Sequence, residues 1–417
     1  MKYGLIAEKV GHSFSAEIHK KLFGYDYELK AIKKEELDAF MKAKDFLSVN
    51  VTIPYKEAVI PYLDYVNPIA NDIGAVNTIV NNNGELRGYN TDALGLTAMI
   101  LRSGAEIKDK KVLIFGSGGT SKTALYVVNK LLCREAYRVS RSEKEGCITY
   151  HEAYGKHNDA DIIINTTPVG MFPDTEGTPI EISEFKKLSS VFDVVYNPLR
   201  TRLLCEARDR GIMAVGGLYM LVAQAAFAAE RFVGKTVDNS RIDEIYREML
   251  LQKENIVLIG MPRSGKSSTG KIIAEKSGRI FVDTDEEIII KTGRHPSEII
   301  SAEGEEVFRD IEADVIKEIS LRQGLVIATG GGAILRGENI KRLKQNGRLY
   351  FLDRALDSLT VSEDRPLSSS YELLEKRYNE RYPKYLAAAD CVIKAVDGKE
   401  LNANAVMEEM KYENSRA

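Results

Sequence analysis

A glycine-rich segment in the second half of the chain carries the strongest chemical signal. Residues 256–259 are apolar, and Gly260 is followed after four residues by Gly265, Lys266 and Ser267. This order is typical of a phosphate-binding loop, because the glycines let backbone N–H groups turn onto phosphate oxygens and the following helix N-terminus adds partial positive charge. The lysine then reaches the β- and γ-phosphates and the serine ligates Mg²⁺. The segment predicts an ATP site with Mg²⁺ rather than an ordinary strand–helix turn.

A second glycine-rich turn, over residues 116–120, has the form of a dinucleotide-binding loop. It follows a predicted strand over 111–115, whose residues 112–115 are apolar, and it precedes a predicted helix over 122–130, which is the context that the motif requires. The next predicted strand, 136–139, ends in a segment containing Arg141 in place of the usual acidic residue. Because a guanidinium binds phosphate in bidentate fashion, Arg141 favours NADP over NAD.

Polar side chains follow other predicted strands of the first half. Lys56 stands at the end of the strand predicted over 46–53, where sites of α/β proteins gather. Segments 74–78 and 88–92 each end a strand-like run, and each carries amide, hydroxyl or carboxylate groups that are suited to binding a polyol.

Several of these residues also have ordinary structural explanations. Ser15 and Asp92 could cap helices. Gln224 interrupts the apolar helix predicted over 218–232, so it must either bond the backbone or face a ligand.

In the second half, Asp283 and Asp285 follow the predicted strand 280–282, at a spacing that puts both on one side of an extended chain. A glycine run at 330–332 follows the predicted strand 325–328. A single arginine of this half does not indicate a binding site, because a single arginine is more often a solvated surface residue. Only the arginines taken together with the other motifs are informative.

Composition excludes several classes of protein. The 417 residues exceed the size at which one core keeps growing, so two or three domains are expected. A net charge of −3 gives no reason to expect nucleic acid or a membrane as partner. The four cysteines are widely spaced, which supports neither a zinc site nor a disulfide framework. We expect a cytoplasmic protein that acts on small molecules.

The motifs of residues 1 to about 248 together resemble those of shikimate dehydrogenases. In family order they are Ser-x-Ser after the first strand, Asn-Val-Thr-x-Pro-x-Lys ending at Lys56, Gly-Ala-Val-Asn-Thr from Gly74, Asn-Thr-Asp ending at Asp92, Gly-x-Gly-Gly from Gly116, Asn-Thr-Thr-Pro-x-Gly-Met ending at Met171, and Met-x-x-x-Gln ending at Gln224. The resemblance implies that Lys56 and Asp92 are the catalytic pair. The substrate-binding residues that it implies are Ser13, Ser15, Thr52, Asn77, Tyr196 and Gln224. The implied NADP(H)-binding residues are Gly116, Ser117, Gly118, Gly119, Thr120, Arg141, Met171 and Gly217.

Residues 255 to about 400 resemble shikimate kinases. After the phosphate loop come Asp-Thr-Asp from Asp283, Phe-Arg ending at Arg309, the glycine run, Asp-Arg-Pro-Leu around Arg365, and Arg-Tyr-Pro-Lys-Tyr from Arg381. The resemblance implies that Asp285 is catalytic and orients the acceptor hydroxyl, while Ser267 and Asp283 hold Mg²⁺. The implied ATP-binding residues are Gly260, Arg263, Ser264, Gly265, Lys266, Ser267, Ser268 and Arg365. The implied substrate-binding residues are Asp285, Arg309, Gly330, Gly331, Gly332 and Arg381.

The kinase-like half departs from its family in one segment. The relatives usually have a longer lid with another arginine before the Arg-Pro-Leu. In this chain the corresponding segment, residues 359–364, is short and acidic and contains no arginine. Lid arginines neutralise charge on the transferring phosphoryl group. We therefore expect weak ATP affinity, and a kinase half that serves only as a binding or regulatory module stays open as the alternative.

The resemblances predict an α/β protein with three parts. These are a substrate domain over residues 1–97, completed by helices from about 216–248, a Rossmann NADP domain over 98–215, and a P-loop kinase domain with a parallel sheet over 255–417. The expected activities are reduction of 3-dehydroshikimate with NADPH and phosphorylation of shikimate with ATP. Reduction of quinate with NAD is a rival activity for the first half, and the oligomeric state is left open.

Overall fold

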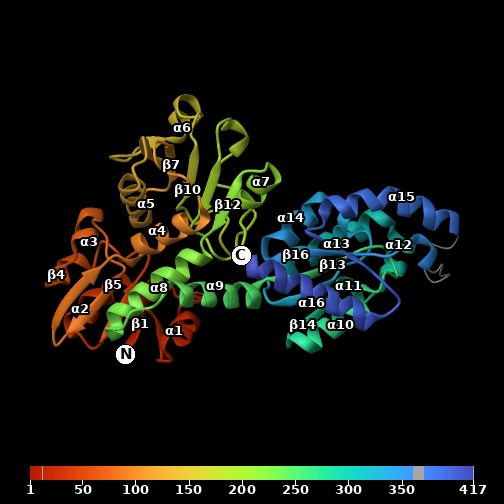
Figure 1. Ribbon diagram of the computed structural model, residues 1–417, viewed down its shortest axis with the longest axis horizontal. Coiled ribbons are helices and arrows are strands. Elements are labelled where there is room, and N and C mark those ends of the chain that lie inside the picture. The colour runs from red at the N-terminus through yellow and green to blue at the C-terminus, as the bar shows by residue number, and fades with distance from the viewer. Residues whose placement is uncertain (12, 360–370, 417) are drawn as a thin grey trace. The chain divides into compact units, whose positions relative to one another are not determined.

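The computed structural model describes residues 1–416 apart from residue 12 and residues 360–370, and it divides into two compact units (Figure 1). Unit 1 comprises Met1–Asn197 and Thr201–Glu248, and unit 2 comprises Pro198–Arg200 and Met249–Ala417. Both units are α/β, as the sequence predicted. None of the helices in the described ranges is both long and apolar enough to cross a membrane.

The first sheet of unit 1 is mixed and has the strand order β2-β1-β3-β5-β6-β4. Strand β5 is antiparallel to both of its neighbours. It joins β6 through Asn83 and Gly84, whose positive φ angles of 52° and 96° are those of the tight turn that Asn-Gly favours in hairpins. The strands are β1 Tyr3–Ala7, β2 Glu28–Ala31, β3 Ser48–Val51, β4 Tyr65–Val66, β5 Thr78–Asn82 and β6 Glu85–Tyr89.

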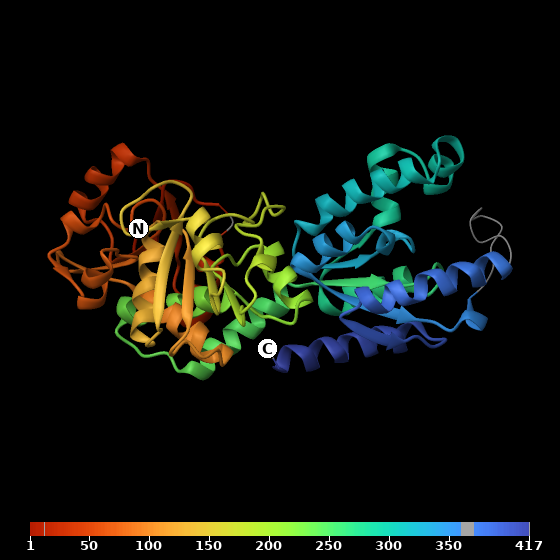
Figure 2. The same ribbon diagram turned by 90° about the horizontal axis from the view of Figure 1, so that it is seen from above.

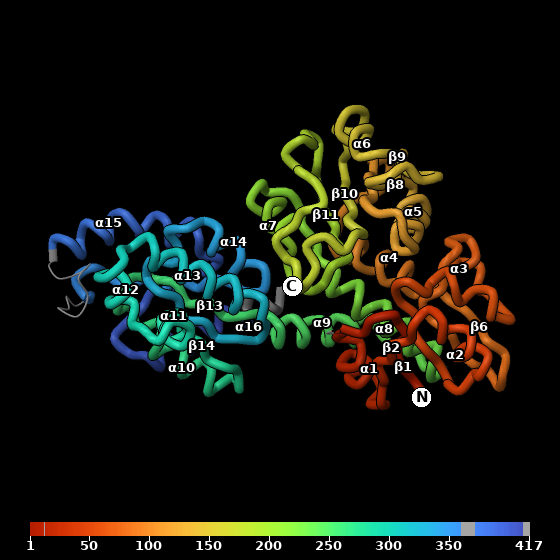
Figure 3. Tube along the Cα trace, turned by 180° about the vertical axis from the view of Figure 1, so that it is seen from behind, coloured from red at the N-terminus to blue at the C-terminus, as the bar shows by residue number. Residues whose placement is uncertain are grey.

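Helices from both ends of unit 1 cover this sheet. Helix α8, which begins more than 120 residues after β6, returns to pack against α1 and α4 (Figure 3). Helices α4 and α8 approach closely at Gly95, where a Cβ atom would lie 2.7 Å from the carbonyl oxygen of Met220. The helices are α1 Ser15–Phe23, α2 Leu37–Ala43, α3 Pro68–Ile73, α4 Thr91–Ser103, α8 Leu218–Val233 and α9 Asn239–Lys253, with 3₁₀ turns η1 Lys34–Glu36 and η2 Ile60–Tyr62.

The second sheet of unit 1 is entirely parallel and has the order β12-β11-β10-β7-β8-β9. This is the doubly wound order of dinucleotide-binding folds, and it confirms the predicted Rossmann arrangement. The gold strands β7 and β8 run side by side in Figure 2. The elements are β7 Lys111–Phe115, α5 Gly119–Lys130, β8 Glu135–Ser140, β9 Ile148–Thr149, α6 Tyr150–Lys156, β10 Ile162–Asn165, η3 Ile182–Glu184, β11 Ser190–Asp193, α7 Arg202–Asp209 and β12 Met213–Gly216.

Unit 2 contains one parallel sheet with the order β14-β15-β13-β16-β17. Alternate residues of β13 face opposite layers: Val257 and Ile259 pack towards α13, α14 and α15, whereas Ile256 and Leu258 pack towards α10 and α16. Figure 1 shows these two helical layers on either side of the strands. The strands are β13 Asn255–Ile259, β14 Ile280–Asp283, β15 Leu325–Ala328, β16 Gly347–Asp353 and β17 Cys391–Lys394. The helices are α10 Lys266–Ser277, α11 Thr284–Thr292, α12 Pro296–Glu303, α13 Glu305–Ser320, η4 Ala333–Leu335, α14 Gly337–Asn346, η5 Leu356–Ser358, α15 Tyr371–Ala388 and α16 Lys399–Arg416.

Two local predictions were wrong, and one alternative explanation is ruled out. The segment 74–78 does not end a strand: it follows α3, which Gly74 ends with a φ of 70°, and it leads into β5. Asp92 does not cap α4, because the side chain of Asn90 accepts the N–H of Ala93 and takes that role. Asp285 is not in an extended chain, since the Asp283 side chain accepts the N–H of Asp285 and starts helix α11 there.

A buried histidine in unit 1 predicts loss of stability in acid. His19 is 1% exposed and stacks on the ring of Tyr27, with ring centroids 4.1 Å apart. Burial lowers the pKa of His19 to about 3, against the opposing effect of a hydrogen bond with Asn50. Because the folded-state pKa is below the ordinary value of 6.5, His19 contributes its full stability only above pH 6.5. Between pH 6.5 and about pH 3, this residue is expected to lower the unfolding free energy by about 1.4 kcal/mol for each pH unit of acidification.

Urea titrations of the full chain above and below pH 6.5 measure this effect. A His19→Gln variant cannot protonate, so its unfolding free energy should decrease less steeply with acid, whereas a His151→Gln control at an exposed position should behave as wild type. Equal slopes for wild type and His19→Gln would contradict the prediction.

Candidate active sites

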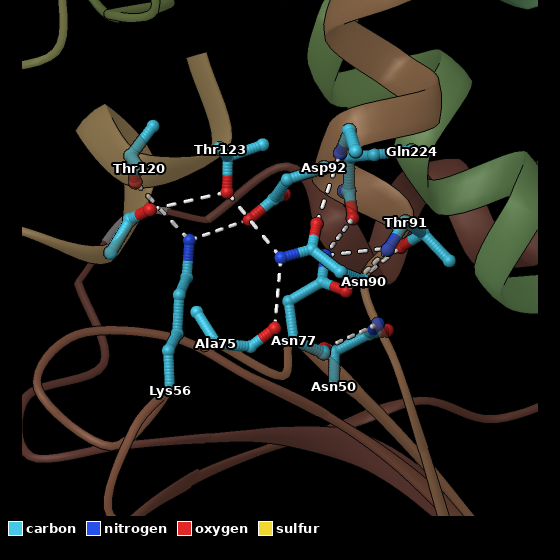
Figure 4. A network of polar contacts seen from close by, with 12 residues as sticks. Asn50, Lys56, Ala75, Asn77, Asn90, Thr91, Asp92, Thr120, Thr123 and Gln224 are labelled. Atoms are coloured by element: carbon cyan, nitrogen blue, oxygen red, sulfur yellow. Dashed lines mark hydrogen bonds and ion pairs between the residues drawn. The ribbon is translucent and has the colours of Figure 1, made fainter. Parts of the chain in front are cut away.

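The predicted catalytic pair of unit 1 forms a direct ion pair (Figure 4). Lys56 follows β3 and Asp92 lies in the first turn of α4, so separate elements deliver the two groups. Lys56 Nζ lies 2.6 Å from Asp92 Oδ2, and the side chains are only 13% and 11% exposed. Lys56 Nζ also donates to Thr120 Oγ1 at 3.3 Å, in the first turn of α5. An ammonium held in this way can meet negative charge that develops on a substrate oxygen and can supply a proton to it.

Amide and hydroxyl groups surround this pair (Figure 4). Asn77 Nδ2 donates to Thr91 Oγ1 at 3.0 Å and to Gln224 Oε1 at 3.5 Å. Gln224 Nε2 in turn donates to the carbonyl of Leu221. Of the two explanations that the sequence left open for Gln224, the bond to the backbone is present, and the other end of its amide accepts a hydrogen bond from Asn77, a predicted substrate residue.

A third group of predicted substrate residues lies at the start of α1. Ser13 Oγ donates to Ser15 Oγ at 3.0 Å and accepts the N–H of Ser15. Ser15 does not cap α1, whose N-cap position is Phe14. Burial raises the pKa of Tyr196, against an opposing hydrogen bond with Ser13, so the phenol stays a protonated donor. Thr52 is half-buried directly after β3.

A cavity of about 710 Å³ is lined both by the glycine loop of the Rossmann sheet and by Lys56. Lys56 and Arg141 both line it, so the predicted proton donor and the predicted phosphate-binding residue share one cavity. Six predicted NADP residues line this cavity, namely Gly116, Ser117, Gly118, Gly119, Thr120 and Arg141. Met171 and Gly217 are not among the lining residues, and Gly217 instead packs against the backbone of Val194.

The residues present fit a dinucleotide. Helix α5 has no side-chain cap at Gly118, so its first N–H groups remain available to a pyrophosphate. Gly116 has a φ of 129°, and a Cβ atom there would lie 2.3 Å from Thr166 Oγ1. The sequence reasoning missed Lys144, whose Nζ donates to the carbonyl of Ser117 at 3.0 Å. Its position three residues after Arg141 was the available signal.

The phosphate loop of unit 2 has the predicted strand–loop–helix structure. Helix α10 begins at Lys266 after Gly265, which has a φ of 93° and provides no side-chain cap. Lys266 is 7% exposed, and its Nζ donates to the carbonyls of Gly260 and Met261 at 2.8 and 2.9 Å. Ser267 Oγ donates to Asp283 Oδ2 at 2.6 Å. Uncapped N–H groups beside a lysine suit the phosphates of ATP, and a hydroxyl against a carboxylate suits Mg²⁺.

The remaining predicted ATP-binding residues differ in their hydrogen bonds and backbone conformation. Ser264 Oγ is buried and has no hydrogen-bond partner among the described residues, Ser268 Oγ donates to the carbonyl of Gly265, and Arg263 has a φ of 64°. Arg365 and the predicted short acidic lid lie outside the residues that the structure describes, apart from Leu359.

A pocket of about 480 Å³ collects every predicted acceptor and metal residue of unit 2. These residues are Ser267, Asp283, Asp285, Arg309, Gly330, Gly331, Gly332 and Arg381. Although Asp285 is helical rather than extended, it faces the same pocket as Asp283. Gly332 lies directly against the guanidinium of Arg309, because a Cβ atom there would lie 2.1 Å from Arg309 Nη2.

The pocket is strongly charged on one wall. Arg309 Nη1 donates to Glu312 at 2.8 Å, and Nη2 donates to Glu305 at 2.9 Å. Burial lowers the pKa of Arg309, but these two carboxylates raise it by more. Burial also raises the pKa of Glu312, against the opposing charge of Arg309.

The charged residues of this pocket that sequence reasoning missed include Glu312 and Arg377. Each is one helical turn from a predicted residue: Glu312 follows Arg309 by three positions, and Arg377 precedes Arg381 by four. This spacing puts both on the pocket-facing side of their helices, and it was the signal that could have found them.

Comparison with known proteins supports each half separately. Residues 5–79 match the model of the shikimate dehydrogenase substrate binding domain, and residues 262–411 match that of shikimate kinase. A shikimate dehydrogenase (NADP⁺) of Clostridium perfringens is 37% identical over 264 residues, which are 59% of this chain and 97% of the relative.

Solved structures of shikimate dehydrogenases resemble more than half of the chain. A chorismate mutase/shikimate 5-dehydrogenase fusion protein of Clostridium acetobutylicum is 36% identical, with a TM-score of 0.56, over 59% of this chain and 96% of that chain. The Thermus thermophilus shikimate 5-dehydrogenase in complex with NADP(H) and shikimate is 29% identical, with a TM-score of 0.54, over 60% of this chain and 99% of that chain. This chain therefore belongs to the shikimate dehydrogenase family and carries a shikimate kinase domain fused after it.

Proposed function

We propose that the protein is a bifunctional enzyme, which reduces 3-dehydroshikimate to shikimate with NADPH and phosphorylates the 3-hydroxyl of shikimate with ATP. The observation that carries this proposal is that each unit brings groups suited to one of the two reactions together in one cavity. In unit 1 these are Lys56 and the dinucleotide loop, and in unit 2 they are Ser267, Asp283 and Asp285.

In unit 1, NADPH bound at the glycine loop supplies the hydride. As the hydride reaches the ketone carbon of the substrate, negative charge grows on the carbonyl oxygen. Lys56 stabilises that charge and supplies the proton, while Asp92 at 2.6 Å orients its ammonium. Asn77 and Gln224 present amide groups beside the pair, where they can bind substrate hydroxyls.

In unit 2, Mg²⁺ held by Ser267 and Asp283 would neutralise charge on the phosphate oxygens. Asp285 accepts the proton of the acceptor hydroxyl and orients that oxygen for attack. Lys266 stabilises the charge of the transferring phosphoryl group. The hydroxyl that reduction creates is the nucleophile of this second step, so the two activities are consecutive.

The alternatives are less well supported. A kinase half that only binds ligands is not favoured, because it retains Lys266, Asp283 and Asp285 in a family-typical arrangement. An NAD-dependent reductase of quinate is disfavoured by Arg141 on the wall of the dinucleotide cavity. We place the enzyme in the cytoplasm, where NADPH and ATP are available.

A coupled assay tests the proposal. The full chain is incubated with 3-dehydroshikimate, NADPH, ATP and Mg²⁺, and the products are identified by mass. Shikimate 3-phosphate is expected, and it should disappear when either NADPH or ATP is omitted. Accumulation of shikimate alone, at saturating ATP, would overturn the assignment of the second activity.

Cofactor preference gives a more local prediction. Arg141→Asp is expected to raise the KM for NADPH by about 10- to 100-fold, since one charge-assisted contact with the 2′-phosphate is lost and a repulsive charge replaces it. The KM for NADH should fall or stay constant, because a carboxylate can accept the ribose hydroxyls. Initial rates with both cofactors measure the change, and Lys186→Asp provides the same charge change at an exposed position outside the cavity. An unaltered KM for NADPH would mean that other residues hold the phosphate.

A further inference from the structure

A buried carboxylate stands where two loops of the Rossmann sheet begin. Asp193 is the last residue of β11, and it lies in register with Asn165, the last residue of the neighbouring strand β10 (Figure 3). Both residues are fully buried. The loop after β10 contributes residues 166–170 to the dinucleotide cavity, and the loop after β11 contains Tyr196, a predicted substrate residue. Asp193 and Asn165 therefore lie between a cofactor-binding loop and a substrate-binding loop.

Asp193 accepts hydrogen bonds from three separate segments. Its Oδ1 accepts the N–H of Val195 and the Nδ2 of Asn165, each at 3.0 Å. Its Oδ2 accepts the hydroxyl of Thr201, the N-cap residue of α7, at 2.7 Å. One carboxylate thus fixes the start of the Tyr196 loop, the end of β10 and the start of α7.

The bond to Asn165 extends this network into the cofactor loop. Because Asp193 accepts its amide nitrogen, Asn165 presents Oδ1 to the loop, where it accepts the N–H and the hydroxyl of Thr167 at 3.0 and 2.7 Å. The hydroxyl oxygen of Thr167 in turn accepts the N–H of Val169 at 3.3 Å. Thr167 and Val169 both line the dinucleotide cavity. A chain of hydrogen bonds therefore connects Asp193 with the wall of that cavity.

The two loops are also bonded to each other and to the segment before α8. The N–H of Phe172 donates to the carbonyl of Asn197 at 2.9 Å, and the N–H of Gly217 donates to the carbonyl of Val195 at 3.0 Å. A Cβ atom at Gly217 would lie only 2.2 Å from the carbonyl oxygen of Val194. A displacement at the start of the Tyr196 loop would therefore move the cofactor loop as well.

The position of Asp193 is costly for a charged group. The carboxylate makes no ion pair with any residue that the structure describes, and an unpaired buried charge destabilises a fold. Burial raises the pKa of Asp193 to about 6, against the opposing hydrogen bonds from Thr201, Val195 and Asn165. An apolar residue would fill the same space without this cost. What the carboxylate supplies is acceptor capacity, because its two oxygens hold donors from three segments at once.

We propose that Asp193 is a positioning residue of the reductase half, which sets the cofactor loop and the Tyr196 loop at the same time. Asp193 is not among the residues that line the dinucleotide cavity, and it acts through Asn165 and Val195. Proton transfer stays with Lys56, which lies outside both loops. The inference rests on the proposed function and adds to it a residue on which the binding of NADPH and of 3-dehydroshikimate both depend.

The test compares Asp193→Ala with Asp193→Asn in the full chain. Alanine removes all three acceptor contacts, so we expect the KM for NADPH and the KM for 3-dehydroshikimate each to rise by about 10-fold, with little change in kcat. The amide oxygen of asparagine can still accept from Asn165 and Val195, and its NH₂ group can donate to the hydroxyl of Thr201. Asp193→Asn should therefore restore both KM values to within about threefold of the wild type. A partial loss of folded enzyme lowers the apparent kcat and leaves KM unchanged, so the KM values distinguish positioning from stability.

Two further variants separate the contacts of the network. Asn165→Ala removes the connection to Thr167 but keeps the bond between Asp193 and Val195, so it should raise the KM for NADPH by about 10-fold and leave the KM for 3-dehydroshikimate near the wild-type value. Ser190→Ala is the matched control, because it removes a buried polar group of the same strand whose hydroxyl contacts the sulfur of Met213. It should behave as wild type.

Several results would overturn the proposal. Unchanged KM values in Asp193→Ala would do so, and so would an Asp193→Asn variant as impaired as the alanine variant, because the charge rather than the hydrogen bonds would then matter. If Asp193→Ala fails to fold, Asn165→Ala decides, and an unchanged KM for NADPH in that variant counts against the network. If the wild type fails to reduce 3-dehydroshikimate, the proposed function is wrong, and fluorescence titration of the same variants with NADPH still decides whether Asp193 positions the cofactor loop.

Discussion

Replacing Lys56 with alanine is expected to lower the rate of 3-dehydroshikimate reduction by about 10²- to 10⁴-fold, the range typical of general acid catalysis. The variant loses both the proton donor and the positive charge that faces the developing oxyanion. Phosphorylation of added shikimate should continue at the wild-type rate, because the groups that carry it belong to unit 2. Steady-state rates of the two half-reactions, measured on the same preparation, test both statements.

Controls separate catalysis from stability in this experiment. Without Lys56, the carboxylate of Asp92 is left mostly buried and unpaired, which can itself destabilise unit 1. The double variant Lys56→Ala/Asp92→Asn removes that charge, so it should recover stability but not activity. Lys42→Ala, at an exposed position of α2, should retain full activity. A normal reduction rate in Lys56→Ala would show that another group donates the proton.

Replacing Lys266 with alanine is expected to lower phosphoryl transfer by at least about 10³-fold and to leave reduction intact. Lys266 is the buried cation of the phosphate loop, and its ammonium now bonds the carbonyls of Gly260 and Met261, from which it can turn to phosphate oxygens. Its loss removes charge stabilisation in a site that excludes much of the water, where such interactions are strongest.

The matched control for this variant is Lys271→Ala, on the exposed side of the same helix α10. It should phosphorylate shikimate at the wild-type rate. Residual phosphorylation close to wild type in Lys266→Ala would contradict the assigned role. Loss of both activities in either the Lys56 or the Lys266 variant would instead indicate that the two units depend on each other for folding.

Local patterns were sufficient to predict both glycine loops. At residues 255–267 and 111–120, an apolar strand, a glycine turn and a helix follow each other within a dozen positions. Backbone geometry in such a segment depends on neighbouring residues, because glycines readily adopt the positive φ angles that the turns require, such as 129° at Gly116 and 93° at Gly265. The element order of the parallel sheets followed from the same local alternation.

Predictions that depended on side-chain direction were less secure. Asp285 was expected on an extended chain and lies in the first turn of α11, since the hydrogen bond from its N–H to the Asp283 side chain starts the helix earlier. Asp92 was weighed as a cap, but Asn90 caps α4 and leaves Asp92 to Lys56. In both cases two polar residues compete for one helix end, and the sequence does not show which one is closer.

By itself, the sequence determined the class of fold, the two nucleotide loops and the residue types of the reacting groups, because these depend on short-range spacing and on side-chain chemistry. Only the tertiary structure decided how the charges are shared. Arg309 is bonded to two glutamates of its own helix, and it shares the pocket with Arg381 of α15. The helices α13 and α15 face one pocket although Glu312 and Arg377 are 65 positions apart in the chain, and charge pairing across such a pocket follows from distances in space that no pattern along the chain contains.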